Sequence, residues 1–589
     1  MTAPPKTKPR TRSSRLPLIL VIVVPVLVLW PVVSAEFIPL DDPANVSRNP
    51  DFNSPALSKV AHYWTAPFLN MYAPLTYTTW AGVARIAWMD STDESGLQLN
   101  PYVFHAANLV LHVACALLVY AILRRLLARV ELPALEPSAD SRWAACTGAL
   151  LFALHPMQVE PVGWVTGFRD VLAAMFSLAS LLTYLNSATQ DGRARARSYA
   201  LSCAFLLAAL LSKPTTVIVP LIAAALDWGV LRRSQRDVAK SVAGLLLLVI
   251  PFAILTKRFQ SADVTFTPPP WSRPVIAADA LAFYAGKVVL PLRVGLDYGR
   301  SPRWLLDQPG MAWAWAAIVP IAVALWMLRR RPWIIAGVGV FAASVLPVLG
   351  LVKFDFQHHS TVADRYVYLG MLGPALLLAC AVHNGGRSTA VICGVLLLLL
   401  AARSHVQSYA WKNGESIFHA TLATNPTSLI AHRGLGVIAM SAGRNADAEA
   451  HFDAALRGHP DDPVTHFHLG NLYLATRRPK EAILHLRVAA ATHEQPWVAT
   501  NLANALAQTG DIAEAQKVLE AALVKTPQSP ELHATLAAVL FRQGNRAAAA
   551  DRYRAALRIK ADFSVAAQEL AALERATPTT SAPSTRASP

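Results

Sequence analysis

The strongest constraint on this chain is a series of apolar stretches that recurs through its first two-thirds. Most approach the roughly 20 residues that a helix needs to cross a bilayer. They lie at about 16–35, 103–123, 143–157, 168–187, 198–212, 214–231, 241–256, 312–328, 332–352, 366–383 and 388–403. With 54% hydrophobic and only 15% charged residues, the chain predicts a multi-pass, all-α membrane bundle with about eleven crossings.

One further apolar segment, about 276–292, is weaker than the others. It carries Asp279, Lys287 and Pro291, and such residues are costly at membrane depth. We therefore expect a re-entrant segment or a partly buried helix there.

Arginine-rich turns predict the orientation of the bundle, because basic residues accumulate on the cytoplasmic side. The basic residues 1–15 precede the first apolar run, which we interpret as a signal anchor and not as a cleaved signal peptide. The other basic turns are Arg124, Arg125 and Arg129; Arg193, Arg195 and Arg197; Arg232, Arg233 and Arg236; and Arg329, Arg330 and Arg331.

The opposite, extracytoplasmic side then receives the remaining loops. These are the loop 36–100, the HPMQVEP turn, the region 257–311, the HHSTVADRY loop and everything after a connector at 405–428. The membrane domain is thus predicted to occupy 16–404.

The formal charge of +16 does not indicate a nucleic-acid partner. Residues 413–580 carry 16 Lys and Arg against 16 Asp and Glu, so the positive excess lies in the membrane part, beside its spans. The five cysteines fall in or beside apolar runs and show no CxxC or Cys/His spacing. We expect neither a disulfide framework nor a structural metal.

Residues 429–575 repeat with a period of about 34 residues, which is typical of tetratricopeptide repeats (TPR). Four units agree in register: Leu435, Gly436, Ala448, Phe452, Ala455 and Pro460; Leu469, Gly470, Tyr473, Ala482, Leu486 and Ala489; Leu502, Leu506, Ala515, Leu519, Ala522 and Pro527; and Leu536, Leu540, Ala549, Tyr553 and Ala556. The pattern predicts an α-solenoid that binds a protein or an extended peptide. Residues 576–589, rich in Thr, Ser, Pro and Ala, are predicted to be disordered.

An acidic pair, Asp41 and Asp42, follows the first span in FIPLDDPANVSRNPDF. Further polar motifs come in a fixed order: MYAPLTYTTW, PYVFHAANLVLH, LFALHPMQVEPVGWVTGFRDVLAAMFSL, SKPTTVIVPLIAAALDW and VADRYVYL. Together with the repeats, this ordered set resembles the transmembrane and TPR O-mannosyltransferases and their bacterial relatives. Those proteins belong to the GT-C glycosyltransferase superfamily, and the resemblance extends from about residue 15 to 575.

The resemblance implies an inverting enzyme that moves a sugar, mannose or another hexose, from a polyprenyl-phosphate carrier to Ser or Thr of extracytoplasmic proteins. By this likeness Asp41 or Asp42 is the catalytic base, with Asp42 slightly favoured. Such a transfer needs a carboxylate to take the hydroxyl proton and a cation to hold the departing phosphate. No cofactor is required, although the neighbouring carboxylate leaves room for an optional Mg or Mn ion.

The candidates for binding the donor phosphate are Arg365, Arg169 and Lys213. The alternative is that Arg365 pairs with Asp364 or Asp355, and Arg169 with Asp170. The predicted cavity residues are His155, Glu160, Asp170 and Tyr366. His358 and His359 beside Asp355 lack the further spacing that a metal site requires.

One position departs from the animal enzymes of this family. Pro214 follows Ser212-Lys213 where an acidic residue is expected, a form associated with bacterial relatives. We therefore expect a bacterial inner membrane, with a cytoplasmic N-terminus and periplasmic repeats. Two other functions stay open: a membrane-anchored TPR scaffold for envelope proteins, and a transporter. A transporter predicts paired internal repeats with polar breaks, which the sequence does not show.

Overall fold

The computed structural model describes residues 15–93, 96–129, 140–259, 266–310, 323, 326, 327, 331–492 and 495–575. Helices dominate these residues, with two isolated β-bridges and no strand among them, so the predicted all-α class is confirmed. The chain forms two compact units, Met1–Ser428 and Leu429–Pro589. The predicted tail 576–589 and almost all of 1–15 lie outside the described residues.

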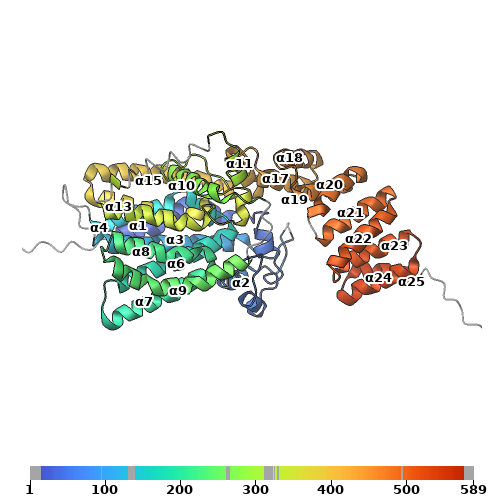
Figure 1. The fold of residues 1–589 in the computed structure, drawn as a ribbon, viewed down its shortest axis with the longest axis horizontal. Helices are drawn as coiled ribbons and strands as arrows, with labels where there is room; N and C mark the ends of the chain where they lie inside the picture. Colours follow the sequence, from blue (N-terminus) through green and yellow to red (C-terminus); the bar gives the residue numbers. More distant parts are fainter. Residues whose placement is uncertain are drawn as a thin grey trace, which may run out of the picture. The chain divides into compact units, whose positions relative to one another are not determined.

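The first unit is a bundle of apolar helices that run side by side (Figure 1). Six described segments are long and apolar enough to cross a membrane: Leu16–Ser34, Pro101–Leu127, Val165–Ser187, Gly192–Ser212, Gln235–Phe259 and Arg387–Trp411. They contain α1 (Leu16–Leu29), α3 (Pro101–Leu127), α6 (Phe168–Ser187), α7 (Gly192–Ser212), α9 (Gln235–Phe259) and α15 (Arg387–Ser408). These six correspond to six predicted spans.

Four other predicted spans form shorter helices. They are α4 (Ser141–Leu154), α8 (Val219–Gly229), α13 (Pro332–Val345) and α14 (Leu372–Asn384). At 1.5 Å per residue they are about 16–21 Å long, less than the roughly 30 Å hydrocarbon core. The predicted span 312–328 lies almost wholly outside the described residues, and 276–292 corresponds to α10 (Arg273–Val289). The number of eleven crossings stays a prediction.

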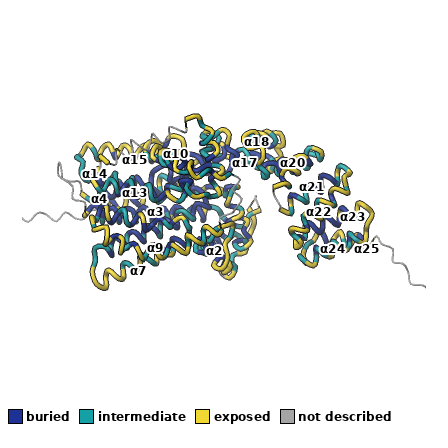
Figure 2. Tube along the Cα trace, viewed as in Figure 1, coloured by how far each residue is buried: buried dark blue, intermediate teal, exposed yellow. Residues whose placement is uncertain are grey.

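The interior of the bundle is built around α3, which contacts α1, α4 and α6. Buried residues concentrate along its middle helices, while α7 and α9 keep much exposed apolar surface (Figure 2). Exposed apolar faces of this kind suit contact with lipid. At one end, the segment after the first span and α2 (Pro74–Ala87) form a cap (Figure 1). An aromatic cluster that includes Phe52, Tyr63, Tyr77 and Trp80 packs this cap.

The second unit consists of four helix pairs and a final helix. They are α17 (Leu429–Ser441) with α18 (Asn445–Gly458), α19 (Pro463–Ala475) with α20 (Pro479–Thr492), α21 (Pro496–Thr509) with α22 (Ile512–Lys525), α23 (Pro530–Arg542) with α24 (Arg546–Ile559), and α25 (Ser564–Arg575). Gly436 and Gly470 bring the helices of a pair together, since a Cβ there would lie 2.5 Å from Phe452 and 2.6 Å from Leu486. The predicted repeat solenoid is confirmed.

Candidate active site

Asp42 is fully buried where the loop after the first span meets the turn before α6. Its carboxylate accepts three hydrogen bonds: from the backbone N of Ile38 at 2.8 Å, and from the backbone N and hydroxyl of Thr166 at 3.0 and 2.6 Å. Burial raises the pKa of Asp42 to about 7, although its hydrogen bonds to Thr166 and Ile38 act in the opposite direction. The loop and the turn are thereby joined across 124 residues of sequence.

Asp41 lies beside it in the opposite situation, because its side chain is 52% exposed. Its Oδ2 atom lies 3.6 Å from Nη2 of Arg169. The structure thus distinguishes the two candidate carboxylates: Asp42, slightly favoured in the sequence analysis, has no exposed surface, whereas Asp41 is open and faces a cation.

Arg169 lies in the first turn of α6, with its side chain only 14% exposed. Besides Asp41, it contacts Sδ of Met71 through Nη1 at 3.8 Å, and its Nε is buried without a hydrogen-bond partner among the described residues. The predicted alternative pairing with Asp170 is not what the structure shows. A guanidinium with an unused buried donor has capacity left for an anionic ligand.

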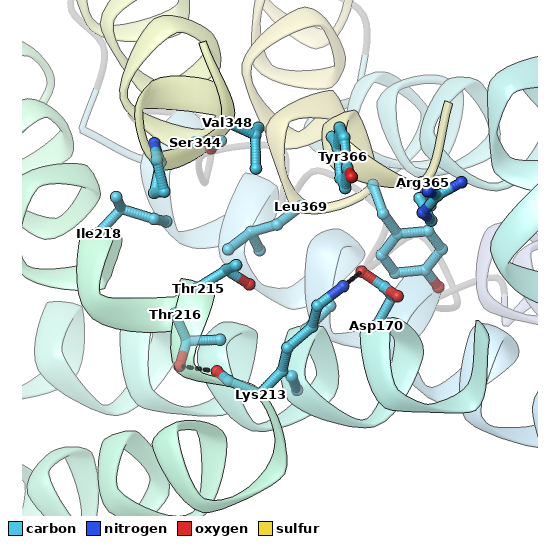
Figure 3. Close-up of a pocket in the computed structure, with 14 residues that line it drawn as sticks. Asp170, Lys213, Thr215, Thr216, Ile218, Ser344, Val348, Arg365, Tyr366 and Leu369 are labelled. Atoms are coloured by element: carbon cyan, nitrogen blue, oxygen red, sulfur yellow. Dashed lines mark hydrogen bonds and ion pairs between the residues drawn. The ribbon is translucent and has the colours of Figure 1, made fainter. Parts of the chain in front are cut away.

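A pocket with polar and apolar lining lies beside Asp170, the residue that follows Arg169 (Figure 3). The pocket is small, with a volume of about 50 Å³ and an open mouth. Its lining includes Asp170, Lys213, Thr215, Arg365 and Tyr366. The pocket thus brings together two of the three predicted phosphate ligands and two of the four predicted cavity residues.

Lys213 follows the end of α7 and points across the pocket toward Asp170 (Figure 3). The distance from its Nζ to Oδ1 of Asp170 is 2.5 Å, and both side chains are 12% exposed. Burial lowers the pKa of Lys213, and the Asp170 carboxylate opposes this effect. This largely buried ion pair therefore lies at the wall of the pocket.

Arg365 is held by Glu160, not by the predicted partners Asp364 or Asp355. Glu160 accepts from Nη1 of Arg365 at 2.5 Å and from its backbone N at 3.2 Å. The guanidinium also lies over the ring of Phe356, at 4.2 Å from its centroid. Burial raises the pKa of Glu160, and Arg365 counteracts the rise. Arg365 is thus a fixed, already paired cation at the pocket wall.

Two other predicted cavity residues do not line this pocket. Glu160 is engaged behind Arg365, and His155 is fully buried. The Nε2 of His155 faces the carbonyl of Val288 at 3.1 Å, and its Nδ1 accepts from the backbone N of Met157 at 3.3 Å. The backbone therefore satisfies both ring nitrogens. In the described part of the chain, no group of three or more His, Cys, Asp or Glu is arranged to hold a metal.

Sequence reasoning missed three residues that organise this site. Thr166 binds Asp42, Asn45 donates to the backbone carbonyl of Asp41 at 2.8 Å, and Tyr77 donates to Asn45 at 2.8 Å. Asn45 begins the sequence Asn-Val-Ser, yet it is 2% exposed and fully engaged, so it serves the loop structurally. No local pattern marks Thr166 as a partner of residue 42.

Comparisons with known proteins agree with the predicted relationship. Tetratricopeptide-repeat family models match residues 399–463, 439–496, 496–539 and 530–555. A protein O-mannosyl-transferase of Caenorhabditis elegans is 23% identical over 482 residues, 76% of this chain and 63% of that protein. The protein O-mannosyl-transferase TMTC1 of Homo sapiens is 23% identical over 60% of this chain and 45% of its own length.

The chain thus covers less than two thirds of either relative. Among solved structures, the TPR protein YrrB is 18% identical over 30% of this chain and 90% of its own, with a TM-score of 0.25. The similarity to the transferases covers most of the chain, and the repeats match by themselves. The chain is therefore similar to the protein O-mannosyl-transferases over most of its length, and its own C-terminal part carries tetratricopeptide repeats.

Proposed function

We propose that this protein is an inverting, integral-membrane glycosyltransferase that moves a hexose, mannose in the first instance, from a polyprenyl-phosphate carrier to Ser or Thr hydroxyls of proteins. The observation that carries the proposal is the first turn of α6. Arg169 on this turn lies beside the open carboxylate of Asp41, and the next residue, Asp170, binds Lys213 in the pocket. The proposed base Asp41 and the proposed donor-binding cation Lys213 thus contact consecutive residues of α6.

On the acceptor side, Asp41 takes the proton as the hydroxyl oxygen attacks the anomeric carbon. The bond between that carbon and the carrier phosphate breaks, and the electron pair leaves with the phosphate. Arg169 lies beside the Asp41 carboxylate and has a donor left for a negatively charged group. A Mg or Mn ion is optional for this step. Measuring hexose transfer with and without a metal chelator tests whether the ion is needed.

On the donor side, Lys213 and Arg365 supply positive charge to the pocket, and Thr215 and Tyr366 line it. Fixed cations stabilise the charge that develops on a departing phosphate without reorganising first. The apolar surfaces of α7 and α9 are suited to the isoprenoid chain of the carrier. We assign the protein to the bacterial inner membrane, with the site and the repeats on the periplasmic side.

The repeats indicate a protein-binding role, and we assign them to the recognition of the acceptor protein. A non-catalytic scaffold would need the repeats but not the carboxylate of Asp41. Deletion of residues 429–575 and the point variant below therefore separate the two functions.

The test is the Asp41→Asn variant in cells that lack the wild-type protein, with mass spectrometry of periplasmic proteins for hexose on Ser or Thr. We expect loss of the modification at unchanged protein abundance. Asp90→Asn is the matched control, because Asp90 is an exposed carboxylate of the same loop, and it should retain full modification. Full modification by Asp41→Asn would contradict the assignment of the base.

A further inference from the structure

The acidic pair divides into one carboxylate that faces outward and one that faces inward. All contacts of Asp42 are with donors of the protein itself: the backbone N of Ile38 and both donors of Thr166. Its exposed fraction is zero. A carboxylate whose two oxygens are already engaged, and which has no exposed surface, is poorly placed to take a proton from an acceptor hydroxyl.

The same contacts fix where Asp41 lies. Asp42 ties the loop to Thr166, which is three residues before Arg169 and belongs to the short helix η5 (Val165–Gly167) that leads into α6. A second tie runs from Tyr77 of α2 through Asn45 to the backbone carbonyl of Asp41. Asp41 is therefore held from both α2 and the start of α6, with its side chain beside Arg169 at 3.6 Å.

We propose that Asp42 is a positioning residue: its hydrogen bonds to Thr166 and Ile38 hold the loop so that Asp41 stays beside Arg169. The catalytic meaning of this arrangement rests on the proposed transferase function. The geometric claim itself, that the bond between Asp42 and Thr166 maintains the contact between Asp41 and Arg169, does not depend on any activity.

The geometric claim is tested by zero-length cross-linking in the full-length, detergent-purified protein. The Arg169→Lys substitution places an amine next to Asp41, and a carbodiimide then joins the two as an amide that mass spectrometry detects. Lys213 and Asp170, 2.5 Å apart, form an internal control link in the same sample. Adding Thr166→Val should lower the yield at Asp41 about tenfold, on the scale of one lost hydrogen bond to a charged group.

Thr166→Ser keeps the hydroxyl and should restore the yield. If Thr166→Val also loses the control link between Lys213 and Asp170, the smaller change Thr166→Ala is used instead. An undiminished link at Asp41 in the Val or Ala variant, with the control link intact, overturns the positioning role. This outcome is independent of whether the wild-type protein transfers sugar.

Transfer assays on the Arg169-containing protein give the second readout. Thr166→Val should lower kcat about tenfold and leave the donor KM unchanged, and Thr166→Ser should recover the rate. If Asp42→Asn abolishes transfer while Thr166→Val has full activity, Asp42 acts directly and the positioning role is wrong. If the wild-type protein transfers no hexose, the proposed function fails while the cross-linking result still stands.

Discussion

Glu160 and Arg365 form a buried pair across 205 residues of sequence, and they meet twice: the guanidinium donates to one carboxylate oxygen and the backbone N of Arg365 to the other. The pair orients Arg365 at the wall of the pocket that also holds Lys213. Because one partner is a backbone group, the contact fixes the path of the chain as well as the side chain. The Glu160–Arg365 pair therefore supports the structure of the pocket wall that carries Arg365 and Lys213.

Removal of the Glu160 carboxylate should destabilise the membrane unit. Glu160→Ala leaves the Arg365 charge buried without its counterion, which typically costs about 3–5 kcal/mol. The five cysteines are buried or half-buried, so a thiol-reactive fluorescent dye reports unfolding directly. Asp140→Asn is the control in the same unit, because the ion pair of Asp140 with Arg142 is partly exposed and should contribute less than about 1 kcal/mol. Equal melting temperatures for both variants would show that the buried pair has no special weight.

Neutralisation of Lys213 should weaken donor binding more than acceptor binding. Lys213→Gln removes one charge-assisted contact to a phosphate, so we expect the donor Kd to rise about 10- to 100-fold. Titration of the purified protein with hexose-linked polyprenyl phosphate measures this change. Lys240→Gln, at an exposed lysine of α9, should leave the Kd unchanged. A normal Kd for the Lys213 variant would remove Lys213 from the donor site.

The repeats could be predicted from the sequence, whereas the contacts between the residues of the site could not. The helix pairs begin at Leu429, Pro463, Pro496 and Pro530, because a period of 34 residues with fixed small and large positions leaves one register. Asp41, Arg169 and Lys213 were recognisable as candidates because the ordered motifs resemble those of the transferases, and because sugar transfer needs a carboxylate and a cation. Their partners were not.

The missing information was tertiary. Thr166 has no feature that distinguishes it from other threonines, and it becomes a partner of Asp42 only when the loop and the start of α6 meet. Likewise, Arg365 has acidic neighbours in its own sequence, yet it pairs with Glu160 from a different part of the chain. Local spacing predicts neighbours along a helix, but not contacts between distant segments.

Acidic pH should destabilise the repeat unit. Burial lowers the pKa of His468 to about 4, and also lowers the pKa of His485, which lies beside His466. The unfolded chain binds protons near pH 6.5, so it takes up more protons than the folded chain as the pH falls below that value. The free energy of unfolding should therefore decrease from about pH 6.5 downward.

Hydrogen exchange of the full chain at pH 7.5 and 5.5, expressed as protection factors, measures this effect in α19 and α20. His466 donates from Nε2 to the carbonyl of Pro460 at 2.8 Å, so its Nδ1 accepts from Nδ1 of His485, also at 2.8 Å. His468→Gln should reduce the pH dependence, and identical protection at both pH values would contradict the prediction.

A methyl group at Gly436 should destabilise the first repeat. The Cβ of Gly436→Ala would lie 2.5 Å from Cε1 of Phe452, and such overpacking costs about 1–3 kcal/mol, at least as much as the roughly 1 kcal/mol that alanine gains over glycine in a helix. Limited proteolysis between α17 and α18 should become faster. Gly394→Ala in α15, which has no atom within 4 Å of the added Cβ, is the control and should be neutral or slightly stabilising.

Arg169 and Asp170 are consecutive residues of α6. The contact of Arg169 with Asp41 and the contact of Asp170 with Lys213 therefore both depend on the rotation of this helix about its axis. Each residue advances an α-helix by roughly 100°. A single-residue insertion between Asp170 and Val171 would therefore turn Arg169 away from Asp41 and Asp170 away from Lys213 in one step. Tolerance to insertions and deletions should consequently fall to its minimum at this turn, and an insertion there would disable acceptor and donor handling together.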